Sequence, residues 1–306
     1  MKKRVKQLVA IILSSAMVMS LAACGTSETE TESSDATSAE ATETVSTDAD
    51  EGTPVLGGSV TLRYTEFYGE YDPGACNNRA CNTFMYDMLW NLDWETDPDE
   101  FTFAGTYLSS DYLTGQVAES WEVADDYTSI MVHLRDDVYF QDKVAAGFDE
   151  EYDIYKGRQL VADDVKFSYA RLIGIDGYEQ VELDQTNWSN DLAMLESIEV
   201  VDDQTLIFYL NTNTQVGVNS FMCARVQLAG PEWDELTSEQ KVDWQYASGT
   251  GPFILQNYVT DNTMTFVKNP NYWQTDSDGV QLPYLDEVNL VYFADAETTM
   301  ASFISG

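Results

Sequence analysis

Residues 249–273 read GTGPFILQNYVTDNTMTFVKNPNYW, and this stretch decides the fold more than any other part of the chain. Two runs of alternating apolar residues flank a polar turn, which predicts a β-hairpin. A Gly-Thr-Gly-Pro segment precedes the hairpin, and an Asn-Pro-Asn-Tyr-Trp segment follows it. The block has no activated nucleophile, metal-ligand cluster or phosphate loop, so its turns and aromatic residues are more typical of a binding surface than of a reaction centre.

Alternation of apolar and polar residues also predicts strands outside this block. Folded sequence is expected from about residue 55, with a first strand at 59–64. Two hairpins that turn at Asp-Asp pairs and one further strand are predicted at 118–140, 198–210 and 282–293. His133, the only histidine, alternates with the apolar residues of the first of these hairpins. We therefore expect it on the solvated face and assign it no catalytic role.

Apolar residues three and four positions apart predict helices at 82–92, 162–172, 232–244 and 295–306. The second of these helices begins at Asp163 and Asp164, adjacent carboxylates that could suggest acid–base chemistry. Adjacent helical positions do not face one another, whereas an aspartate in the first turn can accept from free N–H groups. We interpret the pair as a helix cap.

The composition is strongly acidic. The chain has 306 residues, 44% of them apolar and 12% aromatic, which is enough for a sizeable core. Asp and Glu number 53 against 15 Lys and Arg, a formal net charge of −38. This balance excludes nucleic acid as a partner, because phosphate binding needs basic surface. A cationic ligand is compatible with it, but a generally acidic extracellular surface is the favoured interpretation.

The N-terminal residues have the composition of targeting and linker sequence. Basic residues, an apolar run at 8–19 and small residues before Cys24 predict a signal peptide at 1–23. The apolar run is too short for a membrane span. Residues 24–54 are mostly small, polar or acidic and cannot bury enough apolar surface to offset the entropy of ordering. They predict a disordered acidic tether.

The sequence predicts no catalytic residue, metal or cofactor. The motifs of serine hydrolases, phosphate-binding loops and zinc proteases are absent, and a single histidine argues against a histidine metal site. Apart from Cys24 the cysteines are Cys76, Cys81 and Cys223, an odd number, which leaves Cys76 and Cys81 either paired or free. The 53 acidic residues supply many accidental carboxylate pairs, so a glycosidase pair is open but not indicated.

Several motifs occur in a characteristic order. The first is an Ala-Glu-Ser-Trp run with an Asp turn and a Leu-Arg-Asp strand, at 118–140. An Ala-x-Asp-Val helix follows at 162–172. The last three are Gly-Thr-Gly-Pro-aromatic at 249–253, Asn-Pro-x-Tyr-Trp at 269–273 and Leu-Pro-Tyr-Leu-Asp at 282–286. This series resembles the family 5 extracellular solute-binding proteins, the oligopeptide- and dipeptide-binding subunits of ABC importers. The resemblance covers 55–306, although Asp163 stands where the family usually has Glu.

The resemblance implies an α/β, periplasmic-binding-protein type II-like fold with two lobes joined by a hinge. The first lobe would carry an extra subdomain at about 96–195. The second lobe would start at about 280–306 and would be largely missing, so that the chain is either a fragment or the product of a broken gene and binds ligand weakly or not at all. Family ligands approach the loop after the first strand, the Gly-Thr-Gly-Pro turn and the tyrosine of Asn-Pro-x-Tyr-Trp, here Phe67, Tyr68, Thr250 and Tyr272.

The implied function is capture of peptides outside the membrane and their delivery to an ABC permease, without enzymatic activity. Leu-Ala-Ala-Cys resembles the bacterial lipobox, which implies cleavage before Cys24 and its acylation. Acyl chains would anchor the protein at the extracytoplasmic face of the cell membrane. The alternatives are an oligosaccharide or chelated metal as ligand of the same class of protein, an extracellular hydrolase, and a structural surface protein.

Overall fold

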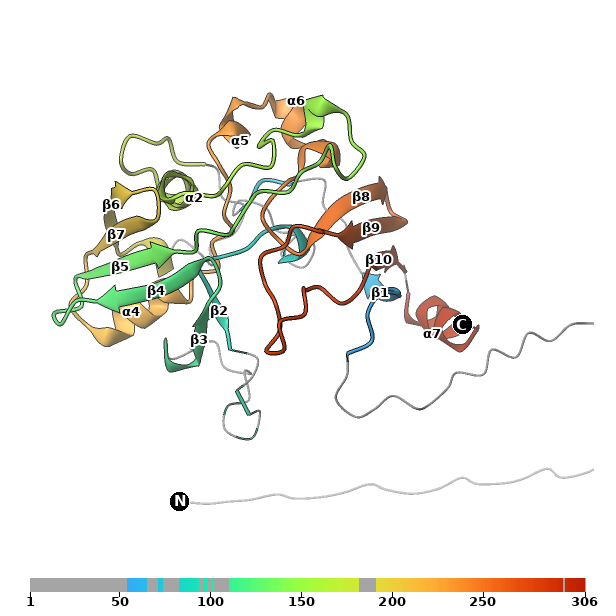
Figure 1. Ribbon diagram of the computed structural model, residues 1–306, viewed down its shortest axis with the longest axis horizontal. Coiled ribbons are helices and arrows are strands. Elements are labelled where there is room, and N and C mark those ends of the chain that lie inside the picture. Colours follow the sequence, from blue (N-terminus) through green and yellow to red (C-terminus); the bar gives the residue numbers. More distant parts are fainter. Residues whose placement is uncertain are drawn as a thin grey trace, which may run out of the picture. The chain divides into compact units, whose positions relative to one another are not determined.

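Two four-stranded sheets organise the part of the chain that the computed structural model describes (Figure 1). The described residues are 54–64, 71–73, 83–93, 96–97, 99, 101, 110–181, 191–293 and 295–305. They belong to one compact unit, Thr53–Gly306. The predictions for the signal peptide, the tether up to residue 53, Cys24, Phe67, Tyr68, Cys76 and Cys81 fall outside the described residues.

The first sheet has the strand order β1-β10-β9-β8. Its strands are β1 (Ser59–Tyr64), β8 (Phe253–Val259), β9 (Thr263–Lys268) and β10 (Glu287–Tyr292). The antiparallel β8–β9 pair confirms the hairpin predicted within 249–273. Strand β10 pairs antiparallel with β9 and parallel with β1, so it lies inside the sheet. The start of a second lobe at about residue 280 stays a prediction, although β10, which follows that residue, pairs within this sheet.

The second sheet is antiparallel, with the order β4-β5-β7-β6. Its strands are β4 (Ala118–Val123), β5 (Ser129–Leu134), β6 (Leu195–Asp202) and β7 (Thr205–Leu210). The two predicted Asp-Asp hairpins are confirmed, and they join through β5 and β7 into one sheet. His133 is half-buried on the face opposite buried Val132 and Leu134, as the alternation predicts. The sheet continues to Leu210, beyond the predicted subdomain limit of residue 195.

The prediction of a helix at 82–92 is wrong over most of its length. Of the described residues in this range, 83–85 alone are helical, and Trp90–Leu92 forms strand β2, which pairs with β3 (Leu113–Gly115). The Leu89 carbonyl accepts from Gln116 N at 2.9 Å and from Ala118 N at 3.2 Å instead of from a helical turn. These tertiary bonds override the local spacing of apolar residues.

Helix α2 (Ala162–Ile173) is the longest described helix and confirms its prediction. Asp164, not Asp163, caps it, because its carboxylate accepts from Val161 N at 2.9 Å. Gly174 ends the helix at φ 73°, a conformation that glycine adopts without strain. Helix α4 (Gln215–Met222) was not predicted.

The single helix predicted at 232–244 is replaced by short pieces: α5 (Glu232–Glu235), α6 (Ser238–Lys241) and the 3₁₀ turn η3 (Trp244–Tyr246). Thr237 interrupts the pattern by capping α6, since its hydroxyl accepts from Gln240 N. Further 3₁₀ turns are η1 (Ser110–Tyr112) and η2 (Glu150–Tyr152). Helix α7 (Ala296–Ser305) confirms the last predicted helix, with Met300 and Phe303 exposed.

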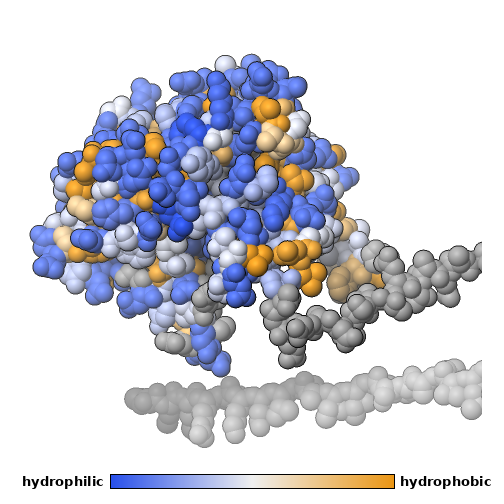
Figure 2. Space-filling view, viewed as in Figure 1, coloured by the Kyte–Doolittle hydropathy of each residue, from blue (hydrophilic) through white to orange (hydrophobic). Residues whose placement is uncertain are grey.

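Each sheet has its own buried core, and α2 contributes to both. Val165 and Tyr169 pack in the core of the second sheet, whereas Phe167 packs in that of the first. Figure 2 shows one face of the molecule, which is mainly hydrophilic with separate apolar patches, in keeping with the acidic composition. The described helices include no candidate for a membrane span.

Candidate functional site

A buried aspartate connects the two ends of the 249–273 block. Asp87 is fully buried, and its carboxylate accepts hydrogen bonds from four described side chains. Oδ1 accepts from Gln116 Nε2 at 2.8 Å and from the Tyr272 hydroxyl at 3.2 Å. Oδ2 accepts from the Thr250 hydroxyl at 3.0 Å and from Trp273 Nε1 at 3.1 Å. The structure thus brings together Thr250 and Tyr272, the two predicted ligand-contacting residues that it describes.

The Gly-Thr-Gly-Pro turn reaches Asp87 because it packs directly on the backbone of 84–86. A Cβ atom at Gly249 would lie 2.4 Å from the Met85 carbonyl oxygen, and one at Gly251 would lie 2.5 Å from the Met85 carbonyl carbon. The Gly251 N–H donates to the Met85 carbonyl at 2.8 Å. Glycine is required at both positions by this close approach, and Thr250 between them is turned toward the carboxylate.

Asparagine and glutamine side chains fix the Asn-Pro-Asn-Tyr-Trp segment to the same turn. Asn269 Nδ2 donates to the Gly251 carbonyl at 3.0 Å, and Asn269 Oδ1 accepts from Asn271 N at 3.1 Å. Buried Gln141 donates to the carbonyls of Gly251 and Phe253 at 3.2 and 2.7 Å. These bonds hold the backbone that places Tyr272 and Trp273 over Asp87.

The four described side chains that donate to the Asp87 carboxylate are all uncharged. Burial raises the pKa of Asp87 to about 6, and the hydrogen bonds from Trp273, Thr250 and Tyr272 keep it from rising further. Burial raises the pKa of Tyr272, and the charge of Asp87 raises it further. Asp87 therefore titrates closer to neutral pH than an exposed aspartate, while Tyr272 stays protonated.

Tyr272 also borders two surface hollows. One has a volume of about 350 Å³ and a mainly apolar lining, with Phe253, Leu282, Tyr284 and Gln274 among its residues. The other has a volume of about 490 Å³ and a more polar lining, including Asp137, Asp142, Lys156 and Trp273. Thr250 lines neither of these two hollows and is 1% exposed. Of the two predicted contact residues that the structure describes, Tyr272 is therefore the one that reaches a concave surface.

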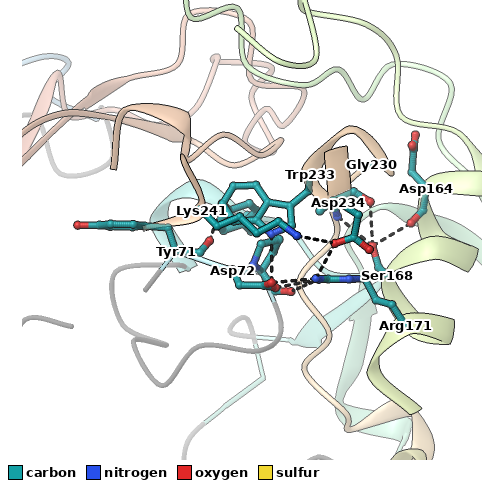
Figure 3. Close-up of polar contacts among 12 residues, drawn as sticks. Tyr71, Asp72, Asp164, Ser168, Arg171, Gly230, Trp233, Asp234 and Lys241 are labelled. Carbon is teal, nitrogen blue, oxygen red and sulfur yellow. Dashed lines mark hydrogen bonds and ion pairs between the residues drawn. The ribbon is translucent and has the colours of Figure 1, made fainter. Parts of the chain in front are cut away.

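A second polar cluster fixes the segment that follows Phe67 and Tyr68 in the sequence (Figure 3). Buried Arg171 on α2 donates from Nη1 and Nη2 to the two carboxylate oxygens of Asp72, each at 2.8 Å. The same Nη2 donates to Asp234 at 3.1 Å, and Trp233 Nε1 donates to Asp72 at 3.1 Å. Lys241 pairs with Asp234 at 3.1 Å. This cluster ties 71–73 to α2 and α5.

Comparison with solved structures shows the class of fold. The chain superposes on a periplasmic binding protein, the ABC transporter-associated DppA of Helicobacter pylori in complex with the peptide STSA. The TM-score is 0.60 and the identity 22%, over 82% of this chain and 46% of that chain. The family model for bacterial extracellular solute-binding proteins, family 5 Middle, matches residues 113–306. The chain belongs to this family, which confirms the resemblance found in the sequence.

Curated relatives differ in the ligands that their names state. Heme-binding protein A of Haemophilus influenzae is 28% identical over 62% of this chain and 34% of its own length. Oligopeptide-binding protein AliA of Streptococcus pneumoniae is 25% identical over 74% of this chain and 36% of its own length. The chain thus spans about a third of the length of these relatives.

The sequence predicted Thr250 and Tyr272 as site residues but missed the residue that joins them. Asp87 lies in an apolar stretch, between Met85 and Met88, that was interpreted as a helix. A lone carboxylate among apolar residues is the available signal, because such a group has to find donors when it is buried. Ligand contact by Phe67, Tyr68, Thr250 and Tyr272 stays a prediction.

Proposed function

We propose that this protein is a lipid-anchored solute-binding component of an ABC importer that captures peptides outside the membrane and delivers them to a permease. The membership of residues 113–306 in the solute-binding family carries the proposal. Relatives whose names state oligopeptide or di- and tripeptide binding favour peptides as the ligand. In this proposal Cys24 carries the anchor and 24–54 is the tether.

The geometry supports different parts in this proposal for the two predicted contact residues that the structure describes. Tyr272 borders both hollows and can meet a ligand there. Thr250 is buried, and its hydroxyl donates to Asp87. In this proposal Thr250 supports the ligand site by holding the Gly-Thr-Gly-Pro turn next to Tyr272. Phe67 and Tyr68 precede the segment anchored by Arg171. Ligand contact by Phe67 and Tyr68 remains part of the proposal.

The ligand class can be tested on the 306-residue chain by a thermal-shift and NMR titration with millimolar di- to nonapeptides, oligosaccharides and metal chelates. We expect peptides to shift the signals, and Tyr272→Ala to weaken the response by about tenfold, the effect of one lost well-packed contact. Tyr209→Ala is the matched control, since Tyr209 lies on β7 and is 37% exposed. A response to oligosaccharides or chelates but not to peptides would replace the proposed ligand.

The anchor has a separate test. Labelled palmitate supplied to cells that express the full chain should be incorporated into the protein, and Cys24→Ala should abolish the label and release the protein from the membrane fraction. Cys223→Ala is the control, because Cys223 lies after α4 in the folded unit. Label that persists in the Cys24 variant would contradict the assignment.

A further inference from the structure

The hydroxyl of Tyr272 has two acceptors within reach. Its oxygen lies 3.2 Å from Asp87 Oδ1 and 3.3 Å from Gln274 Oε1. A phenolic hydroxyl carries a single hydrogen and can donate to only one of them at a time. Gln274 and Tyr272 both line the apolar hollow of about 350 Å³. The same hydroxyl therefore links a buried carboxylate to a surface that is open to ligands.

The four donors around Asp87 are all satisfied only when its carboxylate is ionised. A protonated carboxyl group has a donor of its own, so one neighbour has to become an acceptor. The Gln116 amide N–H and the Trp273 indole N–H cannot do so, whereas the hydroxyls of Thr250 and Tyr272 can. For Thr250 the described contacts provide no acceptor besides Asp87, whereas Tyr272 has Gln274. Tyr272 is the neighbour able to reverse its bond without leaving a hydrogen unpaired.

We infer that Asp87, Tyr272 and Gln274 form a two-state hydrogen-bond relay, in which Asp87 is a positioning residue for the apolar hollow. With Asp87 ionised, Tyr272 donates to Asp87, and the Gln274 oxygen can accept from an N–H group in the hollow. With Asp87 protonated, Asp87 donates to Tyr272, and Tyr272 donates to Gln274. This inference deepens the proposed function and rests on it for the ligand: a peptide that places an apolar side chain and an amide N–H in the hollow binds more tightly when Asp87 is ionised.

The surroundings allow this proton transfer to occur in an accessible pH range. Burial raises the pKa of Asp87 to about 6, and Tyr272 is the titratable side chain bonded to it. Other charged or titratable groups on the segments packed around Asp87 do not bond to its carboxylate. Tyr86 donates to the Tyr71 carbonyl, and Arg225 is exposed. Arg135 is paired with Asp137, and its guanidinium lies 4.5 Å from the Trp273 ring centre.

The relay can be followed through Trp273, whose indole N–H donates to Asp87. In ¹⁵N-labelled full chain the Trp273 indole signal, assigned by its loss in Trp273→Phe, should titrate with a midpoint near pH 6. Gln274→Leu removes the acceptor used only in the protonated state, so the midpoint should fall by about half to one pH unit, the size of one hydrogen bond. Tyr272→Phe removes the middle member of the relay, so in that background Gln274→Leu should leave the midpoint unchanged. Gln204→Leu, at the β6–β7 turn, should change nothing.

A binding measurement separates the relay from the proposed function. The dipeptide Met-Leu, titrated at pH 7.5 and pH 5 and followed by NMR, should bind several-fold more weakly at pH 5, and Gln274→Leu should remove that difference. No Met-Leu binding at either pH, with the Trp273 titration as expected, would leave the relay standing and count against peptide capture through this hollow. A Trp273 midpoint that Gln274→Leu leaves unchanged, or no titration between pH 5 and 7, would overturn the relay.

Discussion

The Asp87 and Arg171 clusters fix neighbouring parts of the same unit by opposite means. Asp87 is a buried charge held by uncharged donors, whereas Arg171 is a buried charge held by two carboxylates. Burial alone would lower the pKa of Arg171, but its bonds to Asp72 and the charges of Asp72 and Asp234 more than offset this, and the net shift is upward. Burial therefore moves the pKa of a charged group toward neutral pH when counter-ions are missing, whereas counter-ions keep a buried group charged.

The largest expected effect is the loss of the Asp87 carboxylate. Asp87→Ala leaves two buried and two half-buried donors without their acceptor, and we expect the free energy of unfolding to fall by about 3 to 5 kcal/mol at pH 5. Urea denaturation followed by tryptophan fluorescence measures it. Asp136→Ala is the control, because Asp136 is exposed and should tolerate the change. An equal loss in both variants would remove the special role of Asp87.

The second largest effect is expected in the pH dependence of the free energy of unfolding, to which the Asp87 cluster contributes. The folded-state pKa of Asp87 is raised from 3.8 to about 6, so the proton stabilises the folded state. That contribution is complete below pH 3.8 and is lost as pH rises through 6, by up to about 3 kcal/mol. Asp87→Asn lacks this pH-dependent contribution. Denaturation curves at pH 4, 5, 6 and 7 should therefore show the wild-type protein losing more stability with rising pH than Asp87→Asn does, and parallel profiles would contradict the shift.

Breaking the Arg171 cluster should reduce the free energy of unfolding by less than the loss of the Asp87 carboxylate does. Arg171→Met keeps the apolar stem and removes the charge. Asp72 then keeps its bond from the Trp233 indole and Asp234 its pair with Lys241, and their side chains are 22% and 42% exposed. Partial solvation limits the expected loss to about 2 kcal/mol. The double variant Arg171→Met/Asp72→Asn should recover part of it, because the second change removes the stranded charge. A double variant that is less stable than both single variants would show that packing, not charge pairing, dominates.

The smallest effect is expected at the rim of the same cluster. Lys241 and Asp234 pair at 3.1 Å, but their side chains are 28% and 42% exposed. Lys241→Met should therefore reduce the free energy of unfolding by about 0.5 kcal/mol or less at low salt, and the difference should vanish at high salt. A loss that persists in high salt would indicate that Lys241 supports Arg171 through Asp234 more strongly than an exposed pair does.

Local pattern predicted those parts of the fold that depend on neighbours in the sequence. The β8–β9 hairpin, the two Asp-Asp hairpins and α2 follow from alternation, turns and caps. The order of motifs predicted the family, which the match to residues 113–306 confirms. The merging of the two hairpins through β5 and β7 was not predicted, because pairing between distant strands leaves no local signal.

The centre of the candidate site is determined by distant contacts. The donors to Asp87 come from positions 29, 163, 185 and 186 residues away. The same kind of contact turns Trp90–Leu92 into a strand where the spacing of apolar residues favoured a helix. Thr250 and Tyr272 were singled out by their motifs, but only the fold shows that both are bonded to one carboxylate.

The parallel pairing of β1 with β10 has a consequence for synthesis of the chain. Ser59 pairs with Glu287, and the bond from Gly58 N to Asp286 spans 228 residues. Since β10 is the only neighbour of β1 in this described sheet, the first strand has no partner until the last one has been made. At about 5 to 20 residues per second, that interval is roughly 10 to 45 seconds. The second sheet closes its own pairs within 118–210, so it can form well before the first.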